Sequence, residues 1–148
     1  MGEYISKSHN KSLLLYHVVI SVKYRRSVLT SDVVDTLVNT CMDLQEKTDI
    51  TFIEIGADGN HIHLLMQTTP SYSLAQYIRN IKSNTARMIF KYNPEVKKKL
   101  WGGEFWSDGY WVSTVSKHGT ENTIREYVKN QGHNKYDLLY KRDENIQF

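Results

Sequence analysis

The sequence has little of what small secreted proteins and membrane proteins depend on. Its single cysteine, Cys41, excludes a disulfide framework within the chain and a cysteine-based zinc cluster. No apolar run approaches the roughly 20 residues of a membrane span. Residues 1–11 are polar and lack the apolar core of a signal peptide. We therefore expect a cytoplasmic protein that makes no membrane contact.

The composition is that of one soluble globular domain. Prolines number 2 and glycines 8, which disfavours long disordered stretches. Hydrophobic residues make up 40% of the 148 residues and charged residues 24%, as expected for a chain with a real core. Because no internal repeat or low-complexity tract divides the sequence, we expect residues 1–148 to form one domain. A net charge of +3 permits a polyanionic partner without requiring one.

Hydrophobic periodicity predicts an α+β fold. Alternating, β-branched runs are typical of strands, and apolar residues three or four apart are typical of helices. The predicted order, β-α-β-β-α-β-β-α, suggests an antiparallel sheet sandwiched by helices, as in ferredoxin-like and RRM-like domains. The predicted elements are strands at 12–24, 50–55 and 61–68, helices at 31–49, 73–91 and 121–131, and a hairpin formed by 104–106 and 110–115 around 107–109.

Three further segments complete the organisation. Residues 1–11 are expected to be a polar lead-in with little regular structure. Residues 119–134 hold the last long helix, preceded by a break at His118-Gly119. Residues 135–148 form a charged tail, for which we expect a short final helix.

Two histidines stand two residues apart, directly after a turn predicted at 57–60, in a run that otherwise has the pattern of a strand. Alternate side chains of a strand share a face, so His61 and His63 lie together and Ile62 lies opposite. Two imidazoles with Cβ atoms about 7 Å apart can bind one divalent metal ion. Because a catalytic metal needs a further ligand, the pair alone is equally compatible with two surface histidines. The pattern does not decide whether His17 joins this face.

A tyrosine and a glutamine lie four residues apart on the last predicted helix. Tyr127 and Gln131 therefore share one helical face. An amide oxygen is a hard donor that suits Mg²⁺ or Mn²⁺. A tyrosine one turn away could attack a phosphorus centre that the metal polarises. Taken alone, Tyr127 is compatible with a partly buried helix residue and Gln131 with a surface residue. Only together with the two histidines does this pair indicate a catalytic site.

Basic residues supply candidate contacts to a nucleic-acid backbone. One cluster closes the first strand around Tyr24, and the other lies off the apolar stripe of the second helix. The first cluster is equally compatible with a solvated strand end, whereas a basic outer face on a helix usually serves only solubility. The candidate DNA contacts are Lys23, Arg25, Arg26, Arg79, Lys82 and Arg87.

Five segments, in this order, resemble the single-tyrosine transposases of the HUH superfamily (His, hydrophobic, His). These are small enzymes of bacterial insertion sequences that move as single-stranded DNA. The resemblance covers nearly the whole chain. The segments are YHVV (16–19) with KYRR (23–26), GNHIHLL (59–65), IRNIKS (78–83), FWSDGYWVSTV (105–115) and IREYVKNQ (124–131).

The resemblance implies a specific chemistry. Tyr127 would be the nucleophile, with His61, His63 and Gln131 holding Mg²⁺ or Mn²⁺, and no nucleotide cofactor would be used. Family members cut and rejoin single-stranded DNA beside hairpins at the ends of the element. They leave a 5′-phosphotyrosine and a free 3′-OH. They act as homodimers in which the tyrosine helix of one subunit can complete the active site of the other.

Three alternatives stay open. The first is a nickase of the same superfamily, either a replication initiator or a relaxase; some initiators use two tyrosines one turn apart. Tyr127 has no such partner, whereas Tyr136 and Tyr140 are four apart in the tail. The second is a domesticated transposase acting on repeated palindromes. The third is a non-catalytic RRM-like module, which would need neither the histidine pair nor the tyrosine and glutamine.

Overall fold

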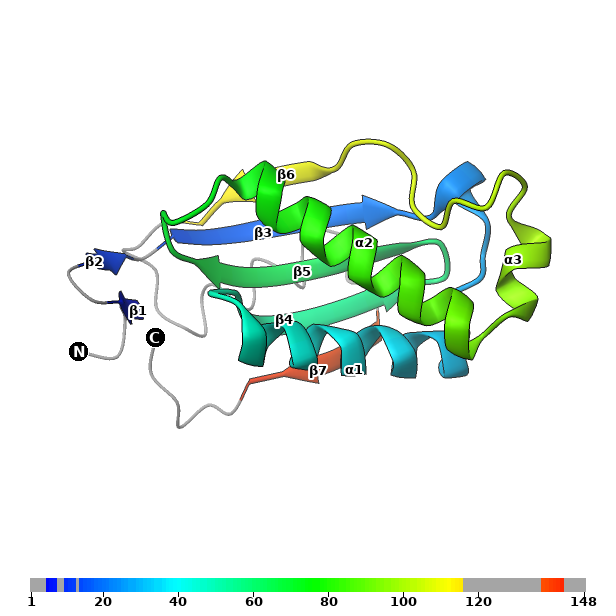
Figure 1. The fold of residues 1–148 in the computed structure, drawn as a ribbon, viewed down its shortest axis with the longest axis horizontal. Helices are drawn as coiled ribbons and strands as arrows, with labels where there is room; N and C mark the ends of the chain where they lie inside the picture. Colours follow the sequence, from blue (N-terminus) through cyan, green and yellow to red (C-terminus); the bar gives the residue numbers. More distant parts are fainter. Residues whose placement is uncertain (1–4, 8–9, 13, 116–136, 143–148) are drawn as a thin grey trace.

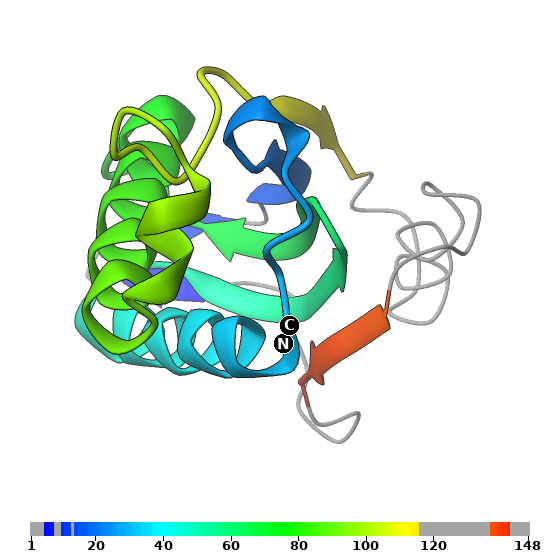
Figure 2. The same cartoon turned by 90° about the vertical axis from the view of Figure 1, so that its right-hand side faces the viewer.

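The computed structural model describes residues 5–7, 10–12, 14–115 and 137–142. Its centre is a five-stranded antiparallel sheet in the order β6-β3-β5-β4-β7, and helices α1 and α2 lie together on one face (Figures 1 and 2). The predicted α+β class is therefore confirmed. The elements are β1 (Ile5–Lys7), β2 (Asn10–Ser12), β3 (Leu14–Ser21), the 3-10 helix η1 (Lys23–Arg25), α1 (Ser31–Lys47), β4 (Thr51–Asp58), β5 (His61–Thr68), α2 (Leu74–Tyr92), α3 (Glu95–Lys99), β6 (Trp111–Thr114) and β7 (Asp137–Lys141).

The hydrophobic core lies between the sheet and the two long helices. Strand alternation turns Ile62 and Leu64 of β5 toward the helices, where they pack with Leu37 of α1 and Ile81 of α2. α2 begins with a capping box, in which the Ser73 hydroxyl and the third helical residue satisfy each other's backbone amides. Within the part of the chain that the structure describes, no helix is long and apolar enough to cross a membrane.

The β4–β5 hairpin fixes the position of the histidine pair. Its two-residue turn places Gly59 at a φ of 57°, in the left-handed region that favours glycine. The pairing that follows sets Asp58 directly opposite His61, and β3 on the other side sets Ser21 opposite His61. The histidine strand is thus central in the sheet, with a neighbour on each side.

The chain leaves β3 through a strained turn beside that hairpin. Tyr24 and Arg25 both have positive φ values, 58° and 52°, in a conformation that non-glycine residues rarely adopt. The predicted strand at 12–24 therefore ends earlier, at Ser21. Backbone hydrogen bonds tie this segment to the hairpin turn, from Val22 N to Asn60 O at 2.8 Å and from Leu29 N to Gly59 O at 3.1 Å.

Three predictions of local structure were wrong. Residues 104–106 and 110–115 do not form a hairpin, because Trp106 bridges to Val22 and β6 pairs with β3. The tail residues Asp137–Lys141 form the edge strand β7 beside β4 rather than a short helix. The lead-in contains the paired strands β1 and β2. For the hairpin and the tail, a pairing partner distant in the sequence overrode the local pattern.

Candidate functional site

The face of the sheet away from α1 and α2 carries the histidines. His61 and His63 lie on it together, as predicted, with ring centroids 4.9 Å apart. His61 is partly exposed near the turn, whereas His63, one step further along β5, is buried. The pair therefore extends from the partly exposed end of β5, at the hairpin turn, into the interior of the protein.

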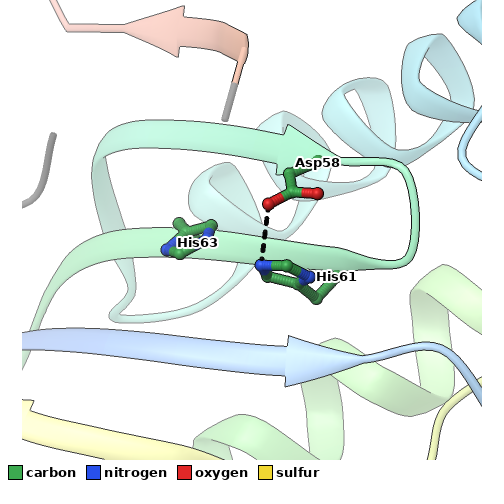
Figure 3. Close-up of side chains that lie close together, drawn as sticks. All are labelled: Asp58, His61 and His63. Carbon is green, nitrogen blue, oxygen red and sulfur yellow. Dashed lines mark ion pairs between the residues drawn. The ribbon is translucent and has the colours of Figure 1, made fainter. Parts of the chain in front are cut away.

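Asp58 joins the two histidines from the neighbouring strand. Its Oδ2 lies 3.1 Å from Nε2 of His61, and Figure 3 marks this contact with a dashed line. One ligand atom from each of Asp58, His61 and His63 lies within 4.8 Å of the other two. Two imidazole nitrogens and one carboxylate oxygen form a donor set that suits a divalent metal ion. The three side chains thus fit the metal that the resemblance implied.

Neighbouring side chains hold both imidazoles. Nδ1 of His61 lies 2.7 Å from Oδ1 of Asn60. Nδ1 of His63 lies 3.3 Å from Nε2 of His17, and these two rings stack with centroids 5.5 Å apart. Trp111 of β6 contacts the His17 ring edge-on at 5.2 Å. His17 therefore belongs to the histidine face, which the sequence left undecided.

Burial keeps the inner histidines neutral. It lowers the pKa of His17 to about 4. The pKa of His63 falls to about 3, mainly through burial and further through the nearby rings of His61 and His17. A neutral imidazole retains the lone pair that binds a metal ion. The single cysteine takes no part here: Cys41 is buried in the core, and burial raises the pKa of its thiol to about 12.

The two remaining predicted site residues, Tyr127 and Gln131, lie outside the described residues, as does the segment 119–134 that carries them. Their roles as nucleophile and third metal ligand stay predictions. Tyr140, considered for a two-tyrosine enzyme, lies in β7 and packs against the core.

The predicted DNA contacts fall into two separate groups. Lys23, Arg25 and Arg26 lie at the end of β3, beside the β4–β5 turn (Figure 1). Arg79, Lys82 and Arg87 lie on α2, on the opposite side of the sheet from the histidines. The structure therefore brings only the first group close to the candidate metal site.

Several of these cations already have protein partners. Lys23 Nζ pairs with Glu104 at 2.9 Å, and this bond raises the pKa of Lys23. Lys82 Nζ donates to the carbonyl oxygens of Ser107 and Gly109 at 2.9 and 2.6 Å, so it holds the loop before β6. Arg87 donates to Asn84 Oδ1 at 2.7 Å. Arg25, Arg26 and Arg79 are exposed.

The sequence interpretation missed Asp58 because turn chemistry accounted for it locally. A signal was present. In a hairpin with a two-residue loop, the residues flanking the loop face each other, so Asp58 has to lie opposite His61. Asn60 was likewise interpreted as a turn residue, and within the segment 59–65 it was given no role of its own.

Residues 10–131 match the family described as transposase IS200-like. The chain belongs to the IS200-like transposase family. As an IS200-like protein it is a DNA transposase. The ISDra2 transposase TnpA of Deinococcus radiodurans is 34% identical over 118 residues, covering 80% of this chain and 84% of that one. The transposase for insertion sequence element IS200 of Salmonella typhimurium is 28% identical over 131 residues, covering 88% and 85%.

Solved structures agree with the IS200-like assignment. A crystal structure of a candidate transposase from Deinococcus radiodurans R1 superposes with a TM-score of 0.67 at 30% identity, covering 86% of this chain and 98% of that one. A REP-associated tyrosine transposase bound to a REP hairpin superposes with a TM-score of 0.56, covering 84% and 69%. Because its identity is 12%, that second likeness supports the fold alone.

Proposed function

We propose that this transposase cuts and rejoins single-stranded DNA beside hairpins at the ends of an insertion sequence, through a 5′-phosphotyrosine at Tyr127. One observation carries the proposal: Asp58, His61 and His63 bring their ligand atoms within 4.8 Å of one another on the histidine face. In a transposase, such a cluster has a direct use in phosphoryl transfer. Gln131 is the further ligand that we assign from the helix of Tyr127.

The metal is Mg²⁺ or Mn²⁺ in this proposal. Carboxylate and amide oxygens suit both ions, and the two imidazoles favour Mn²⁺ over Mg²⁺. When bound, the ion supplies positive charge that stabilises the phosphate oxygens as negative charge develops on them. The neutral state of His63 keeps its lone pair for this ion.

Cleavage and rejoining are one reaction run in two directions. The Tyr127 phenol loses its proton, and its oxygen forms a bond to phosphorus. The bond from phosphorus to the 3′ oxygen breaks, and that oxygen takes up a proton as the free 3′-OH. Attack by a 3′-OH on the phosphotyrosine reverses the step and restores the phenol. The bond energy is kept in the phosphotyrosine, so no nucleotide cofactor is required.

We further propose that the substrate lies against the Lys23–Arg26 segment and that the enzyme is a homodimer whose tyrosine helix can act in the partner's site. Arg25 and Arg26 are exposed beside the β4–β5 hairpin, where they can contact phosphates flanking the cleaved bond. The contacts of Arg79, Lys82 and Arg87 would belong to a different stretch of the DNA, because α2 lies on the other side of the sheet.

The nucleophile is tested with Mn²⁺ and a single-stranded hairpin DNA labelled at its 3′ end, because a 5′-phosphotyrosine holds the strand downstream of the cut. We expect a covalent protein–DNA adduct that survives denaturation and is lost in Tyr127→Phe. Tyr140→Phe is the matched control, because that tyrosine lies in β7, and it should form the adduct normally. An adduct in Tyr127→Phe would refute the assignment. Adduct formation without rejoining of an added 3′-OH strand would favour the nickase alternative.

The shared site is tested by mixing two inactive variants. Tyr127→Phe keeps the histidines, and His63→Ala keeps the tyrosine. If the helix acts in trans, mixed dimers regain one working site and cleavage returns. No recovery in a mixture shown by mass spectrometry to contain heterodimers would mean that the tyrosine acts in cis. A monomer by light scattering at micromolar concentration would contradict the homodimer.

A further inference from the structure

Asn60 lies between the candidate metal ligand His61 and the strained turn that ends β3. Its side-chain Oδ1 lies 2.7 Å from Nδ1 of His61. Its side-chain Nδ2 donates to the carbonyl oxygen of Arg25 at 3.5 Å. Its backbone carbonyl accepts from Val22 N at 2.8 Å. One residue thus contacts both the metal-binding strand and the basic segment.

The Arg25 carbonyl determines which way the Asn60 amide points. A carbonyl oxygen can only accept, so the amide NH₂ has to face Arg25. The amide oxygen then faces His61, and an amide oxygen can only accept as well. Nδ1 of His61 must therefore carry the hydrogen in this contact.

A hydrogen on Nδ1 makes Nε2 the metal-binding nitrogen of His61. Nε2 lies 3.1 Å from Oδ2 of Asp58. In neutral His61 with its hydrogen on Nδ1, the lone pair of Nε2 and the carboxylate of Asp58 converge. Two electron-pair donors brought together in this way are satisfied by a cation bound to both.

We propose that Asn60 is a positioning residue that selects the His61 tautomer able to bind the metal through Nε2. Asn60 also connects this metal ligand to the turn at Tyr24 and Arg25, where we place the DNA substrate. The proposal rests on the metal site assigned under the proposed function, but not on the tyrosine chemistry. Groups that orient metal-binding histidines through their second nitrogen typically change metal affinity or activity about 10–100-fold when removed.

The test measures Mn²⁺ affinity by electron paramagnetic resonance, without DNA. Asn60→Ala removes the acceptor, and we expect Mn²⁺ to bind at least about tenfold more weakly. Asn60→Asp keeps an acceptor oxygen, so its Mn²⁺ affinity should equal or exceed that of the wild type. Asn39→Ala is the matched control, because Asn39 is exposed on α1, and it should leave the affinity unchanged.

A second readout follows the hydrogen itself. In ¹⁵N-histidine NMR spectra of the Mg²⁺-saturated protein, we expect a slowly exchanging Nδ1–H signal from His61 in the wild type and in Asn60→Asp. It should be lost in Asn60→Ala. If Asn60 had a purely structural role, the Nδ1–H signal of His61 would not be retained in Asn60→Asp. If Asn60→Ala does not fold, as judged by circular dichroism, the wild-type and Asn60→Asp spectra still decide.

Three results would overturn the role of Asn60: a hydrogen on Nε2 in the Mg²⁺-saturated wild type, a folded Asn60→Ala that binds Mn²⁺ within twofold of the wild type, or an Asn60→Asp as impaired as Asn60→Ala. Failure of the metal site itself is distinguishable. In that case the wild type would bind no Mn²⁺, or His61→Ala would bind it as well as the wild type does.

Discussion

The two faces of the sheet differ in how much polar surface they bury, although the same strands supply both. On the helix side, β5 contributes the apolar Ile62 and Leu64 to one continuous core. On the other side the same strand contributes His63 and Gln67, which are 3% and 1% exposed. The residues of the two sets alternate along β5, so a shift of one residue in register would exchange the faces.

This difference between the faces indicates that one stabilises the fold and the other serves the reaction. Burying a polar group costs free energy unless hydrogen bonds or a bound ion offset that cost, whereas burying an apolar group is favourable by itself. Yet His17, Glu54, His63 and Gln67 are all buried on the histidine face. A chain needing only stability would gain from apolar residues at these positions. We infer that the helix face holds the fold together and that the histidine face is kept polar for its reaction.

His63→Ala should produce the largest effect, and on activity alone. We expect the rate of single-turnover DNA cleavage in Mn²⁺ to fall by at least about 10³-fold, because charge stabilisation by a bound metal is worth several kcal/mol. The free energy of unfolding in urea, measured without metal, should change by no more than about 1 kcal/mol, since the lost packing is offset by the removed cost of burying an imidazole. Cleavage within tenfold of the wild type would remove His63 from the site.

Leu64→Ala is the matched change one residue further along β5, on the opposite face. Leu64 is fully buried in the core. We expect its truncation to lower the free energy of unfolding by about 2–5 kcal/mol, through lost burial and a cavity. Folded molecules of this variant should cleave DNA within about threefold of the wild type. Should His63→Ala prove as destabilising as Leu64→Ala, the separation of stability from chemistry would not hold.

The contrast between the two faces of the sheet could be predicted from the sequence where it depends on the alternation of side chains along β5. The bounds of β5 were predicted correctly at 61–68, and the shared face of His61 and His63 follows from strand geometry alone. The long helices α1 and α2 were each predicted to within about two residues, because their apolar spacing and capping signals are local.

What the sequence did not predict depends on which strands become neighbours. His17 reaches His63 only because β3 pairs with β5 in a register that sets Val19 opposite His63. Trp106 bridges Val22, and β7 joins the edge of β4, through pairings between residues far apart in the chain. No local period encodes such a choice. The same holds for the positive φ of Tyr24, which is imposed by the turn against the hairpin.

Acid should act on the histidine face before it acts on the helix face. The pKa values of His17 and His63 are lowered to about 4 and about 3, from an ordinary value of 6.5. Between these limits the unfolded chain binds protons that the folded chain does not, so stability is full above pH 6.5 and is lost as the pH falls toward 4. At pH 5 the expected loss is about 2 kcal/mol per histidine, from roughly 1.36 kcal/mol per pH unit.

The measurement is urea unfolding in EDTA at pH 7.5, 6 and 5. His17→Phe should retain only part of the pH dependence, because one of the two buried imidazoles is gone. Leu64→Ala should be less stable at every pH with the wild-type slope, since no titrating group has changed. A wild-type curve that is flat from pH 7.5 to 5 would contradict the lowered pKa values.

The smallest effect is expected from replacing His17. This replacement distinguishes residues that bind the metal from residues that only orient its ligands. His17 lies 3.3 Å from Nδ1 of His63 and packs against Trp111, but it is not among the three side chains whose ligand atoms converge. His17→Phe keeps a ring of similar size and loses the hydrogen bond, so Mn²⁺ should bind about tenfold more weakly, a cost of about 1.4 kcal/mol. His17→Gln, whose amide can bond to Nδ1, should recover part of that affinity. If His17→Phe instead abolishes Mn²⁺ binding as His63→Ala does, His17 is itself a ligand, and the metal lies deeper under the histidine face than Asp58 and His61 indicate.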